Sequence, residues 1–181
     1  ATFIGGIHPY EGKELSEDKP IKYLEPLQGE IMVYPLSQHI GAPAKPLVAK
    51  GDHVLKGQII AEAGGFISAN VLSSVSGTVK GIESKLVANG AMVQSILVEN
   101  DGEEEAIEGF GTDRDASKLS KEEIRQIVKD AGIVGLGGAG FPTHVKLSPK
   151  EPDKIEFIIA NCAECEPYLT ADYRRMLENP E

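Results

Sequence analysis

A glycine-dense run at residues 135–143 is the sequence feature that most narrows the structures this chain can adopt. It reads Gly-Leu-Gly-Gly-Ala-Gly-Phe-Pro-Thr, with glycine at 135, 137, 138 and 140. Without side chains, backbone N–H groups can approach a bound phosphate, and Pro142 pre-sets φ for the first turn of a following helix. The run therefore predicts a phosphate-binding loop, with a plain flexible loop as the alternative.

The residues before this run predict a helix. Ser120 and Glu123 have the spacing of a capping box, and apolar residues recur at helical spacing up to Gly132, namely Ile124, Ile127, Val128 and Ala131. A dinucleotide-binding Rossmann fingerprint needs a preceding strand, and its glycine spacing is not kept here. We therefore expect the order helix, glycine loop, helix.

A short apolar run, Lys154–Ala160, is rich in branched and aromatic residues and predicts a buried strand. It is followed by Asn-Cys-Ala-Glu-Cys-Glu-Pro, which places Asn161, Glu164 and Glu166 just after the predicted strand. Ligands of open α/β sheets bind outside the carboxyl ends of the strands. We therefore expect these three polar residues near a cofactor.

Taken together, the glycine run and the Asn-x-x-Glu-x-Glu-Pro segment resemble the flavin and NADH site of the respiratory complex I 51-kDa subunit. A closer resemblance is to the C subunit of the Rnf electron-transport complex. It extends through residues 161–174 and includes the opening Gly5-Gly6-Ile7-His8-Pro9 and Asp18-Lys19-Pro20-Ile21, so it covers essentially the whole chain.

This resemblance implies a site for FMN, with NAD(H) as substrate. Lys146 would reach the FMN phosphate, Phe141 would stack on a nicotinamide or adenine ring, and Asn161 would hydrogen-bond the flavin or its ribityl chain. The residues implied to wrap the FMN are Gly135, Gly137, Gly138 and Gly140, and those implied to line the dinucleotide cleft are Glu164 and Glu166. Leu136 and Ala163 depart from the complex I pattern, which has an arginine and an acid there, so the resemblance supports the flavin contacts better than the NADH contacts.

The resemblance also implies an NADH/ferredoxin oxidoreductase subunit that passes electrons through FMN. Its partners would be the other subunits of a membrane electron-transport complex, with ferredoxin reached indirectly, and it would lie peripherally on the cytoplasmic side of the membrane. The 4Fe-4S clusters of the family would belong to the intact subunit, outside this chain. A flavin chemistry needs no catalytic side chain, so none is expected.

The first hundred residues predict a different fold. Residues 48–62 and 67–82 alternate apolar and polar positions between Gly-containing turns, which is typical of a small all-β sandwich or barrel. The pattern resembles biotinyl/lipoyl barrel-sandwich domains. A carrier lysine would lie in the hairpin between the two segments, and residues 64–70 contain no lysine. We expect an unmodified barrel-sandwich hybrid.

The cysteines and histidines do not predict a metal site. Cys162 and Cys165 form a C-x-x-C, but the chain has only two cysteines, and zinc or iron–sulfur sites normally take four ligands. A redox dithiol, half a shared metal site and reduced loop thiols stay open, the last being favoured. The histidines lie in separate segments, and only His144 is close to the glycine loop.

Composition and length bound the remaining expectations. A net charge of −10 disfavours nucleic acid as a partner, and no apolar run approaches the ~20 residues of a membrane span. The fold class expected is α+β and multidomain: an arm at 1–24, a barrel-sandwich hybrid at 25–100, a solvated acidic linker at 101–119, and at 120–181 the beginning of an α/β FMN/NADH-binding domain.

Two alternatives to an oxidoreductase subunit stay open. One is a non-catalytic assembly module, in which the β domain docks partners and the glycine loop is vestigial. The other is a related quinone-reductase A subunit, which shares the architecture without the clusters. If the chain is an oxidoreductase subunit, its 181 residues alone are expected to be inactive.

Overall fold

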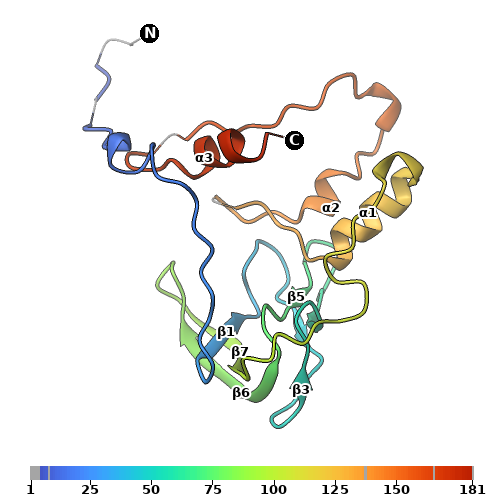
Figure 1. Cartoon of the computed structure of the whole chain (residues 1–181). Coiled ribbons are helices and arrows are strands. Elements are labelled where there is room, and N and C mark those ends of the chain that lie inside the picture. Colours follow the sequence, from blue (N-terminus) through green and yellow to red (C-terminus); the bar gives the residue numbers. More distant parts are fainter. Residues whose placement is uncertain (1–4, 8, 137, 165, 181) are drawn as a thin grey trace. The chain divides into compact units, whose positions relative to one another are not determined.

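The computed structural model describes residues 5–7, 9–136, 138–164 and 166–180. Gly137 and Cys165, both named above, lie outside these ranges. The chain forms two compact units, one made of Ala1–Glu25 with Asp153–Glu181 and the other of Pro26–Pro152 (Figure 1). Since the first unit combines two distant segments, its contacts join residues about 150 positions apart.

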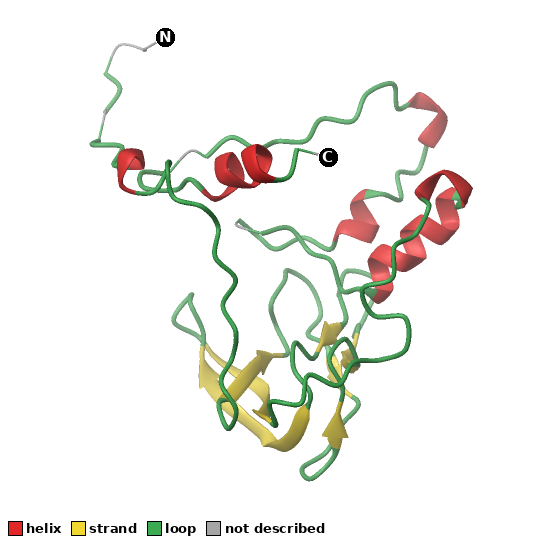
Figure 2. Cartoon of the chain, viewed as in Figure 1, coloured by secondary structure: helices red, strands yellow, loops and turns green. Residues whose placement is uncertain are grey.

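The unit Pro26–Pro152 contains a two-sheet β domain (Figure 2). The strands are β1 (Ile31–Pro35), β2 (Lys45–Pro46), β3 (His53–Val54), β4 (Ile59–Glu62), β5 (Val71–Leu72), β6 (Gly77–Leu86) and β7 (Met92–Asn100). One sheet has the order β1-β7-β6-β3 and the other β2-β4-β5, and every pairing is antiparallel. The two segments predicted from alternation contain β3, β4, β5 and most of β6, which confirms the all-β prediction for this region.

The core of the β domain lies between the two sheets. On β7, Ile96 and Val98 are fully buried, and their partners in the ladder include Tyr34 and Met32 of β1. Val54, Ile60 and other aliphatic side chains fill the same cluster. Because side chains alternate across a strand, one face of β1 and β6 supplies this core and the opposite face stays more exposed, whereas on β7 the opposite face also buries Ser95 and Leu97.

Residues 101–112, within the predicted acidic linker 101–119, are exposed to solvent apart from the half-buried Asp101, and they also contact the β domain. We call them the strap, because they are hydrogen-bonded along the β domain. Lys56 donates its backbone N–H to Glu105 at 2.9 Å and accepts from Ile107 at 3.1 Å. The Lys56 ammonium also lies 2.6 Å from the Glu104 carboxylate. The acids are exposed, as expected, but backbone pairing keeps the segment on the sheet.

Helix α1 (Lys121–Asp130) confirms the predicted helix and its capping box. Ser120 Oγ accepts from the Glu123 N–H at 3.2 Å, while the Glu123 carboxylate accepts from the Ser120 N–H at 2.7 Å. Gly132 follows with φ +64°, the left-handed conformation that ends many helices. A side chain there would collide with the carbonyl of Asn70, so α1 ends directly against the β domain.

The unit built from Ala1–Glu25 and Asp153–Glu181 has little regular structure. It contains the 3-10 turn η1 (Lys13–Leu15) and helix α3 (Ala171–Glu178). The 3-10 turn η3 (Pro152–Lys154) lies at the boundary of the two units, and η2 (Ala116–Lys118) lies in the other unit. None of the helices in the described ranges is long and apolar enough to cross a membrane.

The predicted strand at Lys154–Ala160 is wrong for this structure. Residues 155–160 have no regular structure, and Phe157, Ile158 and Ile159 are 81%, 88% and 87% exposed. A buried parallel strand needs neighbouring strands to accept its hydrogen bonds and helices to cover its faces. Among the described residues, no strand pairs with this segment.

Candidate cofactor-binding site

The glycine run forms a narrow loop with paired ends. Thr143 donates its backbone N–H to Ile133 O at 3.0 Å, and Gly135 donates to Phe141 O at 2.9 Å. At the tip, Gly138 and Gly140 have φ of +55° and +58°, a conformation that L side chains rarely adopt. The loop therefore projects bare backbone from a fixed base, as a close approach to a ligand requires.

The β domain supports one side of this loop. Ile40 donates its N–H to Ala139 O at 3.0 Å, and a Cβ on Gly140 would lie 2.9 Å from Gln38 O. His39, which is buried, holds this supporting segment in place. Its Nε2 accepts from the Ala69 N–H at 3.1 Å, so its proton is on Nδ1, 3.1 Å from Ile40 O.

A cavity of about 720 Å³ adjoins the glycine loop. Its walls are the loop itself, the segment Ser37–Ile40 and the turn Val87–Asn89 between β6 and β7. Leu136, at the loop tip, is 97% exposed. Ligand cavities commonly measure about 300–1,000 Å³. The β-domain walls were not predicted from the sequence, because nothing local in those two segments indicates that they face residues about 100 and about 50 positions further along the chain.

The ammonium group of Lys146 lies beside the glycine loop. Its Nζ is 3.2 Å from the position that a Cβ on Gly135 would take, so glycine at 135 leaves the space that the ammonium uses. The helix that follows Pro142, α2 (Thr143–Lys146), has only four residues, and Pro142 is its N-cap rather than part of its first turn. A helix this short contributes little at its amino end, so the lysine and the bare backbone are the groups that could hold an anion.

His144 faces α1 rather than the glycine loop. Burial is the main reason why its pKa lies below the ordinary value of 6.5, and the nearby Lys129 ammonium lowers it further. Both effects disfavour the charged imidazolium. His144 is therefore a neutral packing residue beside α1, which removes it from the candidate site.

The acidic loop, residues 161–167, belongs to the other unit. Asn161 Oδ1 accepts from the Ala163 N–H at 3.1 Å. The Glu164 carboxylate accepts from the N–H groups of Asp172 at 2.9 Å and Tyr173 at 3.4 Å, so it caps the start of α3. Cys162 is a free, exposed thiol. Across the residues that the structure describes, no group of His, Cys, Asp and Glu has the geometry of a metal site.

The predicted site residues thus fall into two sets. Gly135, Gly138, Gly140, Phe141 and Lys146 come together in the unit Pro26–Pro152, while the first unit holds Asn161, Glu164 and Glu166. Sequence reasoning gave Glu164 a place in a dinucleotide cleft, and it missed the helix cap. The sequence holds a partial signal for this cap, because Pro167 favours a turn. Such a turn, seen at Pro167 and Tyr168, brings Glu164 to the N–H group of Asp172, eight residues later.

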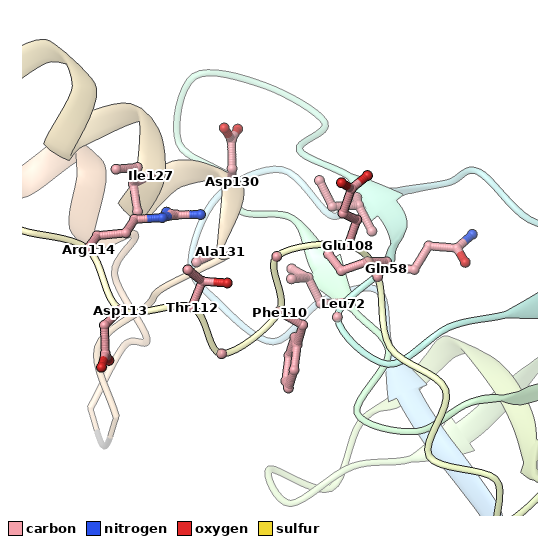
Figure 3. Close-up of a pocket in the computed structure, with 15 residues that line it drawn as sticks. Gln58, Leu72, Glu108, Phe110, Thr112, Asp113, Arg114, Ile127, Asp130 and Ala131 are labelled. Atoms are coloured by element: carbon pink, nitrogen blue, oxygen red, sulfur yellow. The ribbon is translucent and has the colours of Figure 1, made fainter.

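A second cavity, of about 940 Å³, lies between the strap, β4, β5 and α1 (Figure 3). Its inner surface is apolar, with Ile59, Leu72 and Phe110 among the lining residues. Its charged residues are Glu108, Asp113, Asp130 and Arg114, an excess of acids. Carboxylates repel a phosphate, so the smaller cavity beside the glycine loop is the better candidate for a phosphate-bearing cofactor.

The fold and the two loops define a class of protein, a barrel-sandwich domain joined to a segment of FMN-binding type. Residues 1–103 match the family described as the RnfC barrel sandwich hybrid domain, and residues 128–181 match the Nuo51 FMN-binding domain. The chain belongs to the RnfC family, since the first match covers more than half of it.

Curated relatives match almost the whole chain. It is 47% identical over 180 residues to the C subunit of the proton-translocating ferredoxin:NAD(+) oxidoreductase complex of Clostridium ljungdahlii, covering 99% of this chain and 39% of the relative. It is 44% identical over 183 residues to the C subunit of the Na(+)-translocating ferredoxin:NAD(+) oxidoreductase complex of Acetobacterium woodii, covering 99% and 40%. The C subunit of the ion-translocating oxidoreductase complex of Haemophilus influenzae is 40% identical over 181 residues, covering 99% and 27%. The chain thus spans at most two fifths of the length of these relatives.

Proposed function

We propose that this chain is part of the C subunit of an ion-translocating ferredoxin:NAD(+) oxidoreductase complex, and that it helps hold the FMN through which electrons pass. The observation that carries the proposal is the glycine loop, a bare-backbone loop with the Lys146 ammonium against Gly135, inside the segment that matches an FMN-binding domain. The relatives' names supply the reaction: electron transfer between NADH and ferredoxin, coupled to ion movement.

In this proposal each loop has a separate task. The backbone of Gly135, Gly137, Gly138 and Gly140 surrounds the FMN, and Lys146 neutralises its phosphate. Phe141 stacks on a nicotinamide or adenine ring, and Asn161 hydrogen-bonds the flavin or its ribityl chain. Glu164 and Glu166 line the dinucleotide cleft. FMN, when bound, supplies hydride acceptance and single-electron release, and the protein supplies orientation and charge.

The remaining parts of the proposal concern the intact protein. The β domain is an unmodified relative of biotinyl/lipoyl domains that docks neighbouring subunits, and the domain limits are those given by the sequence, 1–24, 25–100, 101–119 and 120–181. The 4Fe-4S clusters lie outside this chain, and ferredoxin is reached through them. The subunit is peripheral, on the cytoplasmic side of the membrane, with other subunits of the complex as partners.

The test is a comparison of FMN with riboflavin, which differ by the phosphate. Flavin fluorescence quenching should show that the protein binds FMN more tightly than riboflavin. In Lys146→Met the FMN dissociation constant should rise by about tenfold, since one charge-assisted contact of about 1.4 kcal/mol is lost, while riboflavin binding should not change.

Lys150→Met removes a lysine of the same charge four residues further on and serves as the matched control. Equal affinities for FMN and riboflavin would contradict the phosphate role of Lys146. Failure of the folded protein to bind either flavin would favour the assembly module instead.

A further inference from the structure

Residues 11–21 of the N-terminal arm are tied closely to the acidic loop and α3. Tyr168 donates its N–H to Glu11 O at 2.6 Å, and Ser16 Oγ lies 2.8 Å from the buried Thr170 Oγ1. Ile21 donates its N–H to the Glu178 carboxylate at 3.0 Å. These contacts join two parts of the chain that are about 150 residues apart, and all lie within one compact unit.

Lys13 is the centre of these contacts. Its ammonium donates to the backbone carbonyls of Glu164 at 3.2 Å, Glu166 at 3.4 Å and Leu169 at 2.9 Å. An ammonium has three donors and no acceptor, so these three carbonyls use all of its N–H groups. Charge-assisted hydrogen bonds are stronger than neutral ones, and here they bind three points of one loop to a single atom.

The residue that follows the acidic loop has a strained backbone. Tyr168 has φ +68°, a left-handed conformation that is costly for a residue with a bulky side chain. Its ring packs on Gly12, where an added Cβ would collide with it, and lies edge to face with Tyr10 at 6.3 Å between ring centroids. The arm therefore compensates for strain at Tyr168.

Glu164, one of the proposed site residues, makes contacts through both its backbone and its side chain. The Glu164 carbonyl binds Lys13, while its carboxylate caps α3 through Asp172 and Tyr173. A shift of the Glu164 backbone would move both its own side chain and the loop that carries Asn161. Lys13 thus fixes the direction in which the acidic loop presents its polar groups.

We propose that Lys13 is a positioning residue, which holds the acidic loop in the conformation that meets the cofactor. The claim that the loop meets the cofactor rests on the proposed function. The claim that Lys13 fixes the conformation of the loop rests only on the contacts described above. The Lys13 ammonium donates to backbone carbonyls, so its action on a cofactor is exerted through Asn161, Glu164 and Glu166.

The first measurement uses no cofactor. Hydrogen exchange of the amides of Tyr168, Asp172 and Arg174 is compared in the wild-type protein and in Lys13→Met, which keeps the chain length and removes the charge. Exchange at these amides should rise by about tenfold, and amides in β6 and β7 should not change. Unchanged exchange at Tyr168 and Asp172 would overturn the proposal.

The second measurement uses FMN. In Lys13→Met the dissociation constant should rise by about tenfold, and the visible circular dichroism of saturating bound FMN should change because its surroundings are reoriented. Lys13→Arg, which keeps a cationic donor, should restore both signals. Faster exchange with unchanged FMN affinity and dichroism would overturn the cofactor role and leave a purely structural lysine.

Lys22→Met provides the control, since it removes the same charge from an exposed position of the arm just after the contacting residues 11–21. It should match the wild-type protein in every measurement. If the wild-type protein binds no FMN, the proposed function fails, whereas the exchange data still decide whether Lys13 fixes the loop. The two failures are therefore distinguishable.

Discussion

At the scale of single residues, the glycines of the candidate site serve different physical purposes. Gly140 combines φ +58° with close approach to Gln38 O, so both its backbone conformation and its surroundings require glycine. Gly135 has an ordinary φ, and the nearest atom to an added Cβ is the flexible end of Lys146, at 3.2 Å. Gly140 is therefore needed for folding, and Gly135 is needed for the position of the Lys146 ammonium.

Substituting each glycine by alanine separates these two purposes. Gly140→Ala should lower the free energy of unfolding by about 1–2 kcal/mol, the usual cost of a left-handed L residue. Gly135→Ala should change it by less than about 0.5 kcal/mol yet weaken FMN binding, because the methyl group displaces the ammonium. Urea denaturation and FMN titration measure the two effects. A larger loss of stability in Gly135→Ala than in Gly140→Ala would contradict this assignment.

The sequence could predict residue roles only where the partners are close along the chain. Ser120 and Glu123 are three positions apart, so the capping box was readable directly. Lys13 and the carbonyl of Glu164 are separated by 151 positions, and no local pattern marks a lysine whose partners are backbone carbonyls. The positioning role of Lys13 could therefore come only from the structure.

At the scale of elements, the strap is held by a small polar network at its start. Asp101 Oδ1 accepts from the buried Ser76 Oγ at 2.6 Å and from the Glu103 N–H at 2.9 Å. The Ser76 hydrogen bond is the main cause that lowers the pKa of Asp101 below 3.8, followed by Glu103 and then His53. Ser76 Oγ in turn accepts from the Glu105 N–H at 3.1 Å, so this one hydroxyl is hydrogen-bonded to both Asp101 and Glu105 of the strap.

This network predicts an acid-dependent stability. A carboxyl whose pKa is lower in the folded than in the unfolded state stabilises the fold above its unfolded value, here 3.8, and the contribution is lost as pH falls through the folded value. Ser76→Ala should therefore reduce the decline in unfolding free energy between about pH 6 and about pH 3. Urea midpoints across this range measure it, with the exposed Ser84→Ala as control. An unchanged pH profile in Ser76→Ala would contradict the network.

Elements with local signals were predictable, and those that depend on distant pairing were not. Helix α1 carries its own cap, its apolar face and its terminal glycine. The apolar run 154–160 carries only strand propensity, which becomes a strand when another strand pairs with it. Alternation in 48–62 and 67–82 predicted the β domain, but β1 and β7 were not predicted individually.

At the scale of the whole molecule, the limits of the two family matches differ from the limits of compact structure. The matches cover residues 1–103 and 128–181, whereas α1 and the glycine loop share a compact unit with the β domain. Asn70 connects them, since its Oδ1 accepts from Ala63 N–H at 2.9 Å and its Nδ2 donates to Lys129 O at 3.4 Å. The FMN-binding segment therefore begins on the surface of the barrel-sandwich domain.

This arrangement predicts that α1 and the β domain unfold together. Gly132→Ala places a methyl group against Asn70 O and Leu72 at a φ of +64°, and it should lower the unfolding free energy of the entire unit by about 1–3 kcal/mol. Native-state hydrogen exchange should then rise equally in α1 and β7. Faster exchange in α1 alone would show that the helix opens independently.

The interleaved path of the chain also has a consequence for the order of synthesis. The unit Pro26–Pro152 is continuous, so it can fold as soon as it leaves the ribosome, and domains generally do fold in this amino-to-carboxyl sequence. The arm emerges earlier, but its carbonyl and carboxylate partners lie at 164–178 and are made later. We therefore expect residues 11–21 to become ordered only after the β domain has folded, when the loop that Lys13 fixes has been translated.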